Sequence, residues 1–461
     1  MKIITKNKLP QGSSGIYAHY HHKNFKDDSW DFIDVRRHVY KNEKKWLDNI
    51  DNWHAELSKV ALDYCKWWWF LNCSRLTSWY PPILKPLFYA YALIELIEEK
   101  DIQNIILLEC PKDVIYYIKE FRPNIEISNL EKPLFKTTLL ELRRLIKSSY
   151  IFQHFILIKQ IVSLLLRAYK AKTKQLYLKD LKLIICSQIL NKESLILKTD
   201  HYYGDIFNKI PNENKLWFYV SNSVQEKEIE QYLIKNNIPY VFAEQLINTS
   251  DILKIWMNCN DVINNIRNIK SELPNLKLNG VLSKLFSINF YNELILTNHP
   301  VLEFSVNCAL IKLLSKNDEV STLVYPYEEK GSERVILDVI SKQENKIKTI
   351  GFAHAVHSTG HLYMRRRKEG YINSPKPDII AVTGQNALKW CVDWANISPQ
   401  QIEVIGSPRF TTPVPIKSTK KERYNCLNVL IISALEFELP MLVNFIEEDR
   451  SLFDKCKLWI R

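Results

Sequence analysis

The longest regular run of apolar positions in the chain has the spacing of an α-helix. It comprises Trp46, Ile50, Trp53, Leu57, Val60 and Tyr64. Residues three and four apart lie on one face of a helix, so the run predicts an amphipathic helix over 46–64. An aromatic segment follows at 67–70, and we expect the prolines at 81 and 82 to stop the helical region.

Beyond residue 100 the pattern changes to short apolar runs, which are typical of strands buried on both faces of a sheet. The runs lie at 105–108, 183–186, 216–220, 240–243, 322–325, 348–352, 379–382, 403–405 and 429–432. Most of them are separated by enough chain for a helix. Alternating strands and helices predict an α/β fold with a parallel, doubly wound, Rossmann-like sheet and extra helices.

A Pro- and Lys-rich segment at 411–421 lacks apolar periodicity and is predicted to be a linker. A strand at 427–433, a helix at 437–448 and a strand beginning at 457 are predicted after it. We therefore expect one α/β domain over 1–415, with a helical insertion near 135–180, and the start of a second over 416–461. Two strands are too few for a stable doubly wound domain, so the second domain is expected to be incomplete.

The most apolar segment, 151–168, is interrupted by Gln153, His154, Lys159, Gln160 and Arg167. Such residues are costly inside a bilayer, so we do not expect a transmembrane helix. Two alternatives stay open. One, which we favour, is a buried helix; the other is a helix at an anionic membrane surface, because basic residues lie in and beside the segment.

The net charge of +12 and the pI of about 9.0 favour an anionic partner, although lysine is abundant throughout the chain. The densest basic run, 365–368, is either a recognition site or a solvated face. No nucleic-acid-binding module is present in the sequence, so nucleic acid is not an expected partner. P-loop, GxGxxG, GxSxG and HExxH motifs are also missing, which disfavours NTPases, dehydrogenases, hydrolases and zinc proteases.

The nine cysteines include no CxxC pair, and the first residues lack the apolar run of a secretory signal. These features predict a protein of the reducing cytoplasm, either free or peripheral at the inner membrane.

The leading candidate site is the loop that follows the strand predicted at 348–352, because ligands bind at the carboxyl ends of strands in open α/β sheets. Its His354 and His357 are candidates for a general base or for a hydrogen-bond donor to phosphate. A structural histidine is the alternative. With His361, the spacing matches no established metal-ligand motif, so a metal is not expected.

Glu328 follows another predicted strand and should share this edge of the sheet. A carboxylate there is a candidate for a catalytic base or for a ligand of a sugar hydroxyl, and the alternative is a solvated charge at a helix start. The neighbouring Glu329 is the weaker candidate.

Two further turns are candidates for binding an anion. Thr383 and Gly384 precede a predicted helix, whose first backbone N–H groups can hold a phosphate. Gly406, Ser407 and Arg409 follow the last strand before the linker, where Arg409 could bind phosphate.

Four stretches together resemble bacterial surface-polysaccharide glycosyltransferases of the two-lobed GT-B type, which build capsule and O-antigen. They are 67–69 with 71–75, Asp200 to Asp205, 327–328 with 333–334, and the run from Gly351 to Arg409. The last run also resembles polyol-phosphate transferases of teichoic-acid type. Ala355 departs from the glycine that follows this histidine in many relatives.

The resemblance implies two Rossmann-like lobes, with the acceptor in the first and the nucleotide mainly in the second. It implies transfer of a sugar from a nucleotide-activated donor, CMP-linked donors included, to a glycan or lipid-linked acceptor. His354 or Glu328 would be the base, and Arg409 and Asp205 would bind substrate or nucleotide. No cofactor is implied. Transfer of polyol phosphate from a CDP-linked donor, and a non-catalytic role in glycan assembly, remain alternatives.

Overall fold

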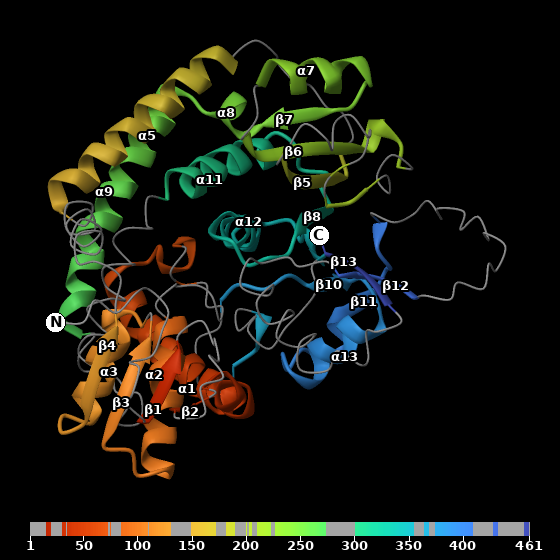
Figure 1. Cartoon of the computed structure of the whole chain (residues 1–461). Coiled ribbons are helices and arrows are strands. Elements are labelled where there is room, and N and C mark those ends of the chain that lie inside the picture. Colours follow the sequence, from red (N-terminus) through yellow and green to blue (C-terminus); the bar gives the residue numbers. More distant parts are fainter. Residues whose placement is uncertain are drawn as a thin grey trace. The chain divides into compact units, whose positions relative to one another are not determined.

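The structure is a computed structural model of the chain (Figure 1). It describes residues 15–19, 30–33, 35–71, 74, 84–108, 110–130, 149–171, 181–189, 200, 202–204, 210–222, 226–272, 300–354, 364–367, 374–408, 427–431 and 456–460. The chain divides into two compact units. The first comprises Met1–Glu43, Pro86–Thr138 and Pro413–Arg461, and the second comprises Lys44–Lys85 and Leu139–Thr412.

The second unit is built on a seven-stranded sheet in which every neighbouring pair of strands is parallel. The strand order is β11-β10-β9-β8-β5-β6-β7. The strands are β5 (Leu183–Ile189), β6 (Lys215–Asn222), β7 (Tyr240–Phe242), β8 (Thr322–Pro326), β9 (Lys348–Ala353), β10 (Ile379–Val382) and β11 (Ile402–Val404). Each coincides with a predicted run to within a few residues, so the prediction of an α/β fold with a parallel, Rossmann-like sheet is confirmed.

The order of the strands reverses in the middle of this sheet. From β5 the chain adds β6 and β7 on one side, and then places β8 to β11 on the other side of β5. The carboxyl ends of β5 and β8 therefore flank a topological switch point, where open α/β sheets bind their ligands.

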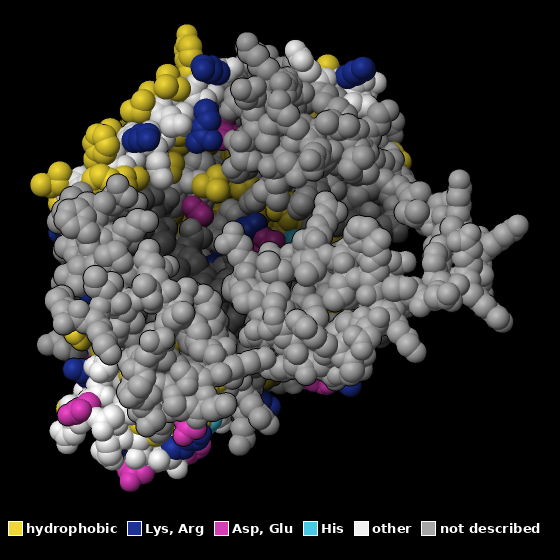
Figure 2. All heavy atoms as spheres, viewed as in Figure 1, with side chains coloured by type: hydrophobic (Ala, Val, Ile, Leu, Met, Phe, Trp, Pro, Cys, Tyr) yellow, Lys and Arg dark blue, Asp and Glu magenta, His cyan; other side chains and the backbone are white. Residues whose placement is uncertain are grey.

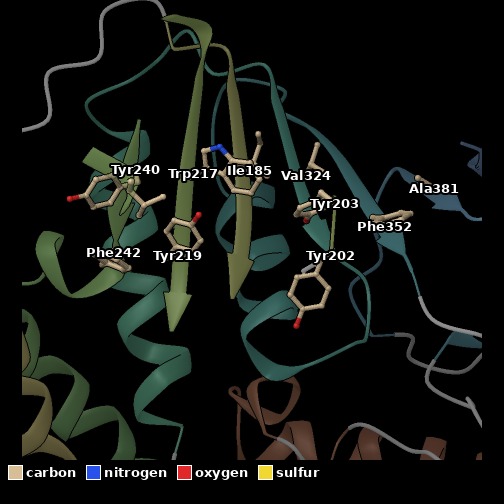
Figure 3. Close-up of a cluster of buried hydrophobic side chains, with 11 residues drawn as sticks. Ile185, Tyr202, Tyr203, Trp217, Tyr219, Tyr240, Phe242, Val324, Phe352 and Ala381 are labelled. Carbon is tan, nitrogen blue, oxygen red and sulfur yellow. The ribbon is translucent and has the colours of Figure 1, made fainter. Parts of the chain in front are cut away.

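One face of the sheet carries an aromatic core (Figure 3). Alternate residues of a strand point to the same face, so Trp217 and Tyr219 of β6 lie beside Tyr240 and Phe242 of β7. The rings of Trp217 and Tyr219 are stacked, with their centroids 6.1 Å apart. This periodicity explains why strands so rich in bulky residues pack as buried central strands.

The helices of the second unit follow the same chain order. They are most of α1 (Val35–Tyr64), then α5 (Tyr150–Ala171), α7 (Glu226–Lys235), α8 (Ala243–Leu246), α9 (Thr249–Glu272), α11 (Val301–Leu314), α12 (Gly331–Ser341) and α13 (Gln385–Asp393). Short 3-10 turns lie at η1 (Trp68–Phe70), η4 (Asn212–Asn214) and η7 (Pro399–Gln401). The helix predicted at 46–64 is confirmed as α1. It begins at Val35 because the polar residues before Trp46 include no proline or glycine to stop it.

Helix α5 confirms that the apolar segment is helical, but only one of its faces is buried. Gln153, Leu157, Leu164 and Ala168 are buried, whereas several apolar side chains on the other side are exposed. Among the described residues, α5 is the helix that could cross a membrane by length and composition alone.

The first unit holds a four-stranded parallel sheet of order β2-β1-β3-β4. Its strands are β1 (Gly15–His19), β2 (Trp30–Phe32), β3 (Asn104–Leu108) and β4 (Glu126–Leu130), with helices α2 (Leu84–Glu99) and α3 (Lys112–Phe121). A separate parallel pair is formed by β12 (Leu427–Ile431) and β13 (Cys456–Ile460), which confirms the strands predicted there. The linker predicted at 411–421 and the helix predicted at 437–448 lie outside the described residues.

Candidate functional site

A pocket lies at the switch point of the seven-stranded sheet. Ser187 from β5 and Pro326 from β8 line it, and Lys330, Ser332 and Glu333 add the start of α12. Tyr202 contributes an aromatic ring to the wall. The lining thus combines hydroxyls, a carboxylate, an ammonium group and an aromatic ring, a set suited to binding a hydroxyl-rich polar ligand.

The two leading candidates of the sequence meet beside this pocket. His354 follows β9 and Glu328 follows the adjacent strand β8, and His354 Nε2 lies 3.3 Å from Glu328 Oε1. Their side chains are only 7% and 22% exposed. The prediction that the two residues share one edge of the sheet is confirmed.

The other ring nitrogen of His354 has no partner. Nδ1 is buried and makes no hydrogen bond to any described residue. The edge of the imidazole meets the ring of Tyr202, with centroids 4.8 Å apart. Since buried polar atoms are nearly always paired, an unpaired nitrogen beside a pocket is the position at which a ligand hydroxyl would complete the site.

Glu328 is held as a carboxylate. Burial raises its pKa, but the hydrogen bond with His354 and the charge and hydrogen bond of Lys330 outweigh burial and lower the pKa to about 2. A carboxylate with so low a pKa is a weak base. The geometry therefore favours Glu328 as the group that orients His354 and stabilises its protonated form, which leaves His354 as the base.

The loop that carries Glu328 is fixed by the next helix. Glu333 Oε2 accepts hydrogen bonds from the backbone nitrogens of Glu328 and Lys330, at 2.8 and 3.3 Å. Tyr327 donates its backbone N–H to the carbonyl of Phe352, at 2.9 Å. These bonds hold the end of β8 against the end of β9, where His354 begins.

Glu329 points away from His354 into a buried ion-pair network. Its carboxylate accepts hydrogen bonds from Tyr327 Oη at 2.8 Å and Lys376 Nζ at 2.6 Å. Arg334 bonds the carbonyl of Glu329 at 2.7 Å and also contacts Ser74 Oγ. With both carboxylate oxygens engaged at 2% exposure, Glu329 anchors the loop.

A turn at Asp200 builds the other wall. Asp200 accepts hydrogen bonds from Ser187 Oγ at 2.7 Å and from the backbone nitrogens of Tyr202 and Tyr203 at 2.8 and 3.1 Å. Gly204 closes the turn with φ of 59°. Asp200 therefore holds Tyr202 against His354 and orients Ser187 at the pocket.

Two glycines permit close packing around the site. A Cβ on Gly351 would lie 2.9 Å from Pro377 Cγ and 3.1 Å from the Tyr327 side chain. A Cβ on Gly331 would lie 2.3 Å from the carbonyl oxygen of Phe70. Gly331 thus lets the start of α12 approach η1.

The remaining predicted residues do not line the pocket. Thr383 and Gly384 follow β10, and Gly384 is the N-cap of α13 as predicted. Gly406 and Ser407 follow β11 at the far edge of the sheet, with a φ of +79° at Gly406. A Cβ at either glycine would meet no atom within 4 Å. His357, Arg409 and Asp205 lie outside the described residues.

The basic run at 365–368 is partly committed to structure. Arg365 pairs with Asp48 of α1, and Arg367 donates to Asp51 Oδ1 at 3.1 Å and contacts His54 Nδ1 at 2.7 Å. Neither recognition nor simple solvation describes these two arginines.

Sequence reasoning missed Ser187, Asp200, Tyr202 and Lys330. The available signal was the segment Asp-His-Tyr-Tyr-Gly at 200–204, in which an aspartate precedes a glycine at turn spacing. The resemblance included this segment but pointed to Asp205. Among the described residues, no group of three or more His, Cys, Asp and Glu side chains is arranged to hold a metal ion.

Comparisons of the chain with protein-family models, with curated proteins and with solved structures found no match.

Proposed function

We propose that the chain is a glycosyltransferase of GT-B type that moves a sugar from a nucleotide-activated donor to a hydroxyl of a surface glycan or a lipid-linked acceptor. One observation carries the proposal: the buried His354–Glu328 pair beside a polar pocket at the switch point of the sheet. Hydroxyl-group transfer needs a base matched to neutral pH, and histidine supplies it.

The reaction follows from the two ring nitrogens of His354. Nε2–H donates to Glu328, so the lone pair of Nδ1 accepts the proton of the acceptor hydroxyl. The hydroxyl oxygen forms a bond to the anomeric carbon of the donor, while the bond from that carbon to the phosphate oxygen breaks and the nucleotide leaves with the electron pair. Glu328 stabilises the imidazolium that results. The carboxylate of Glu333 and the hydroxyl of Ser187 are placed to bind sugar hydroxyls.

The test measures free nucleotide released from CMP-, UDP- and GDP-linked sugars, with and without oligosaccharide acceptors. We expect release from one donor class, and loss of about 100-fold or more in kcat for His354→Gln with nucleotide affinity unchanged. His38→Gln is the matched control, since His38 Nε2 forms a similar partly buried pair with Glu95 at 2.8 Å. The control should retain activity.

Other outcomes separate the alternatives. Release of CMP from CDP-glycerol or CDP-ribitol, with no release from any sugar donor, would assign the site to polyol-phosphate transfer. Calorimetric binding of a nucleotide with no turnover of any donor would favour a non-catalytic binding protein. Full activity in His354→Gln would refute the assignment of the base.

A further inference from the structure

Helix α5 presents a continuous apolar stripe to solvent. The stripe consists of side chains that are 43–82% exposed, namely Ile151, Phe155, Ile158, Val162, Leu165, Leu166 and Tyr169. Successive members are mostly three or four residues apart, so they lie along one side of the helix over its whole length. Figure 2 shows apolar side chains along α5, with Lys and Arg side chains next to them. We call these seven residues the α5 stripe.

The opposite face of α5 is committed to the fold. Leu157, Leu164 and Ala168 are buried. Arg167 pairs with Glu244 of α8 at 3.0 Å, and Tyr150 Oη donates to Asn264 of α9 at 3.3 Å. A spanning helix would have to give up these contacts, so α5 is suited to lie along a bilayer surface and not to cross it.

Charge beside the stripe distinguishes its occupants. At 100° per residue, the exposed Lys159 and Lys170 project about 80–100° from the centre of the stripe, along a single border. This is the arrangement of an interfacial helix, in which apolar side chains enter the acyl boundary while lysines reach anionic head groups. The net charge of +12 favours the same kind of partner.

A second copy of the chain fits the stripe less well. Eighteen residues of helix rise about 27 Å, so a face about 10 Å wide offers roughly 270 Å² per copy. Two copies would bury roughly 540 Å², against about 1,200 Å² for a stable interface. In an antiparallel pair centred near residue 160, both copies of Lys159 would also lie on the same border, close to the two-fold axis.

We propose that the α5 stripe docks the protein onto an anionic phospholipid bilayer, with the helix lying in the plane of the head groups. This inference stands whether or not the chain is a transferase. Its partner is a lipid surface that offers negative charge at head-group level and hydrocarbon a few ångströms below it.

Flotation of the full chain with vesicles tests the proposal. Vesicles of phosphatidylcholine with about one third phosphatidylglycerol should carry the protein upward, and vesicles of phosphatidylcholine alone should carry much less. The double variant Ile158→Glu with Val162→Glu should lower partitioning by about tenfold or more. Ile234→Glu with Ile405→Glu is the matched control, since both side chains are similarly exposed outside the stripe, at 47% and 43%. It should bind like the wild type.

Two further measurements separate the rival occupants. Lys159→Gln with Lys170→Gln should weaken binding to the anionic vesicles, as should raised salt. Equal flotation of the stripe variant and the wild type would overturn the proposal. So would resistance of the bound protein to alkaline carbonate, which indicates a spanning helix, or a dimer in light scattering that the stripe variant converts to monomer.

Discussion

Two adjacent glutamates show how differently single residues behave at the end of β8. Glu328 contacts His354 and Lys330, whereas Glu329 has a φ of 56° and turns into the network of Lys376 and Arg334. The left-handed backbone at Glu329 sends the two side chains to different surroundings. One carboxylate is therefore available to the site and the other is consumed by the fold.

The low pKa of Glu328 has a consequence for stability. Because its pKa in the folded protein is about 2 against an ordinary value of 4.5, its contribution is present above pH 4.5 and is lost as the pH falls towards 2. We expect Glu328→Gln to lower the free energy of unfolding at pH 7, by an amount that shrinks below pH 4.5. Urea unfolding of both proteins at a series of pH values measures this, and a difference independent of pH would contradict it.

Glu303 behaves in the opposite way. Burial raises its pKa to about 7, against the weaker opposing effects of a backbone hydrogen bond and of Arg334. The folded state therefore favours the neutral acid, so the contribution of Glu303 to stability is present below pH 4.5 and is lost as the pH rises through 7. Glu303→Gln should be more stable than the wild type at pH 8, by on the order of 2 to 3 kcal/mol, and should match it near pH 4. Thermal unfolding at the two pH values tests the sign, and a variant that is less stable at pH 8 would refute it.

At the scale of elements, the approach of α12 to η1 depends on one missing side chain. An alanine at 331 would place its Cβ 2.3 Å from the carbonyl oxygen of Phe70 and 2.9 Å from Glu303 Cγ. We expect Gly331→Ala to cost about 2–4 kcal/mol in the free energy of unfolding, because backbone would have to move. Gly384→Ala is the control: its Cβ meets no atom within 4 Å and the backbone is extended, so a change within about 0.5 kcal/mol is expected. Equal effects of the two substitutions in urea unfolding would contradict the packing argument.

The sheet elements also show how far the sequence leads. Strands such as β8 and β9 were predictable because burial on both faces requires a continuous apolar run. Strands β2 and β4, at the edges of their sheet, were missed; β4 alternates Glu126 and Ser128 with apolar residues, and β2 has only three residues. Short or half-polar strands give too little periodicity to be recognised.

The site was predictable to the same degree. His354 and Glu328 follow strands, so the rule for carboxyl ends of parallel strands brought them together. Ser187 and Asp200 are joined by a hydrogen bond across a turn, and no periodicity in the sequence encodes it. Local hydrogen bonds of this kind have to be found in the structure.

At the scale of the whole molecule, the second unit is assembled from two stretches of sequence, Lys44–Lys85 and Leu139–Thr412. Three sets of contacts join them within that unit. Arg334 contacts Ser74, Gly331 packs on Phe70, and Arg367 bonds Asp51 and His54 of α1. The arginine contacts span 313 and 316 residues of chain, so the unit is complete only after both stretches have folded together.

These long-range contacts carry the last prediction. Burial raises the pKa of Asp51, and the charges of Arg367 and Arg365 act against that rise. Arg367→Met would leave Asp51 with less compensation at 7% side-chain exposure, which should cost about 3 kcal/mol or more. Combining it with Asp51→Asn removes the unpaired charge and should recover part of that loss, since an uncompensated buried charge costs more than the pair contributes. Urea unfolding of the two single variants and the double variant forms the cycle. If the two losses simply add, the arginine acts through its own packing, and α1 is held to the later stretch by contacts other than this ion pair.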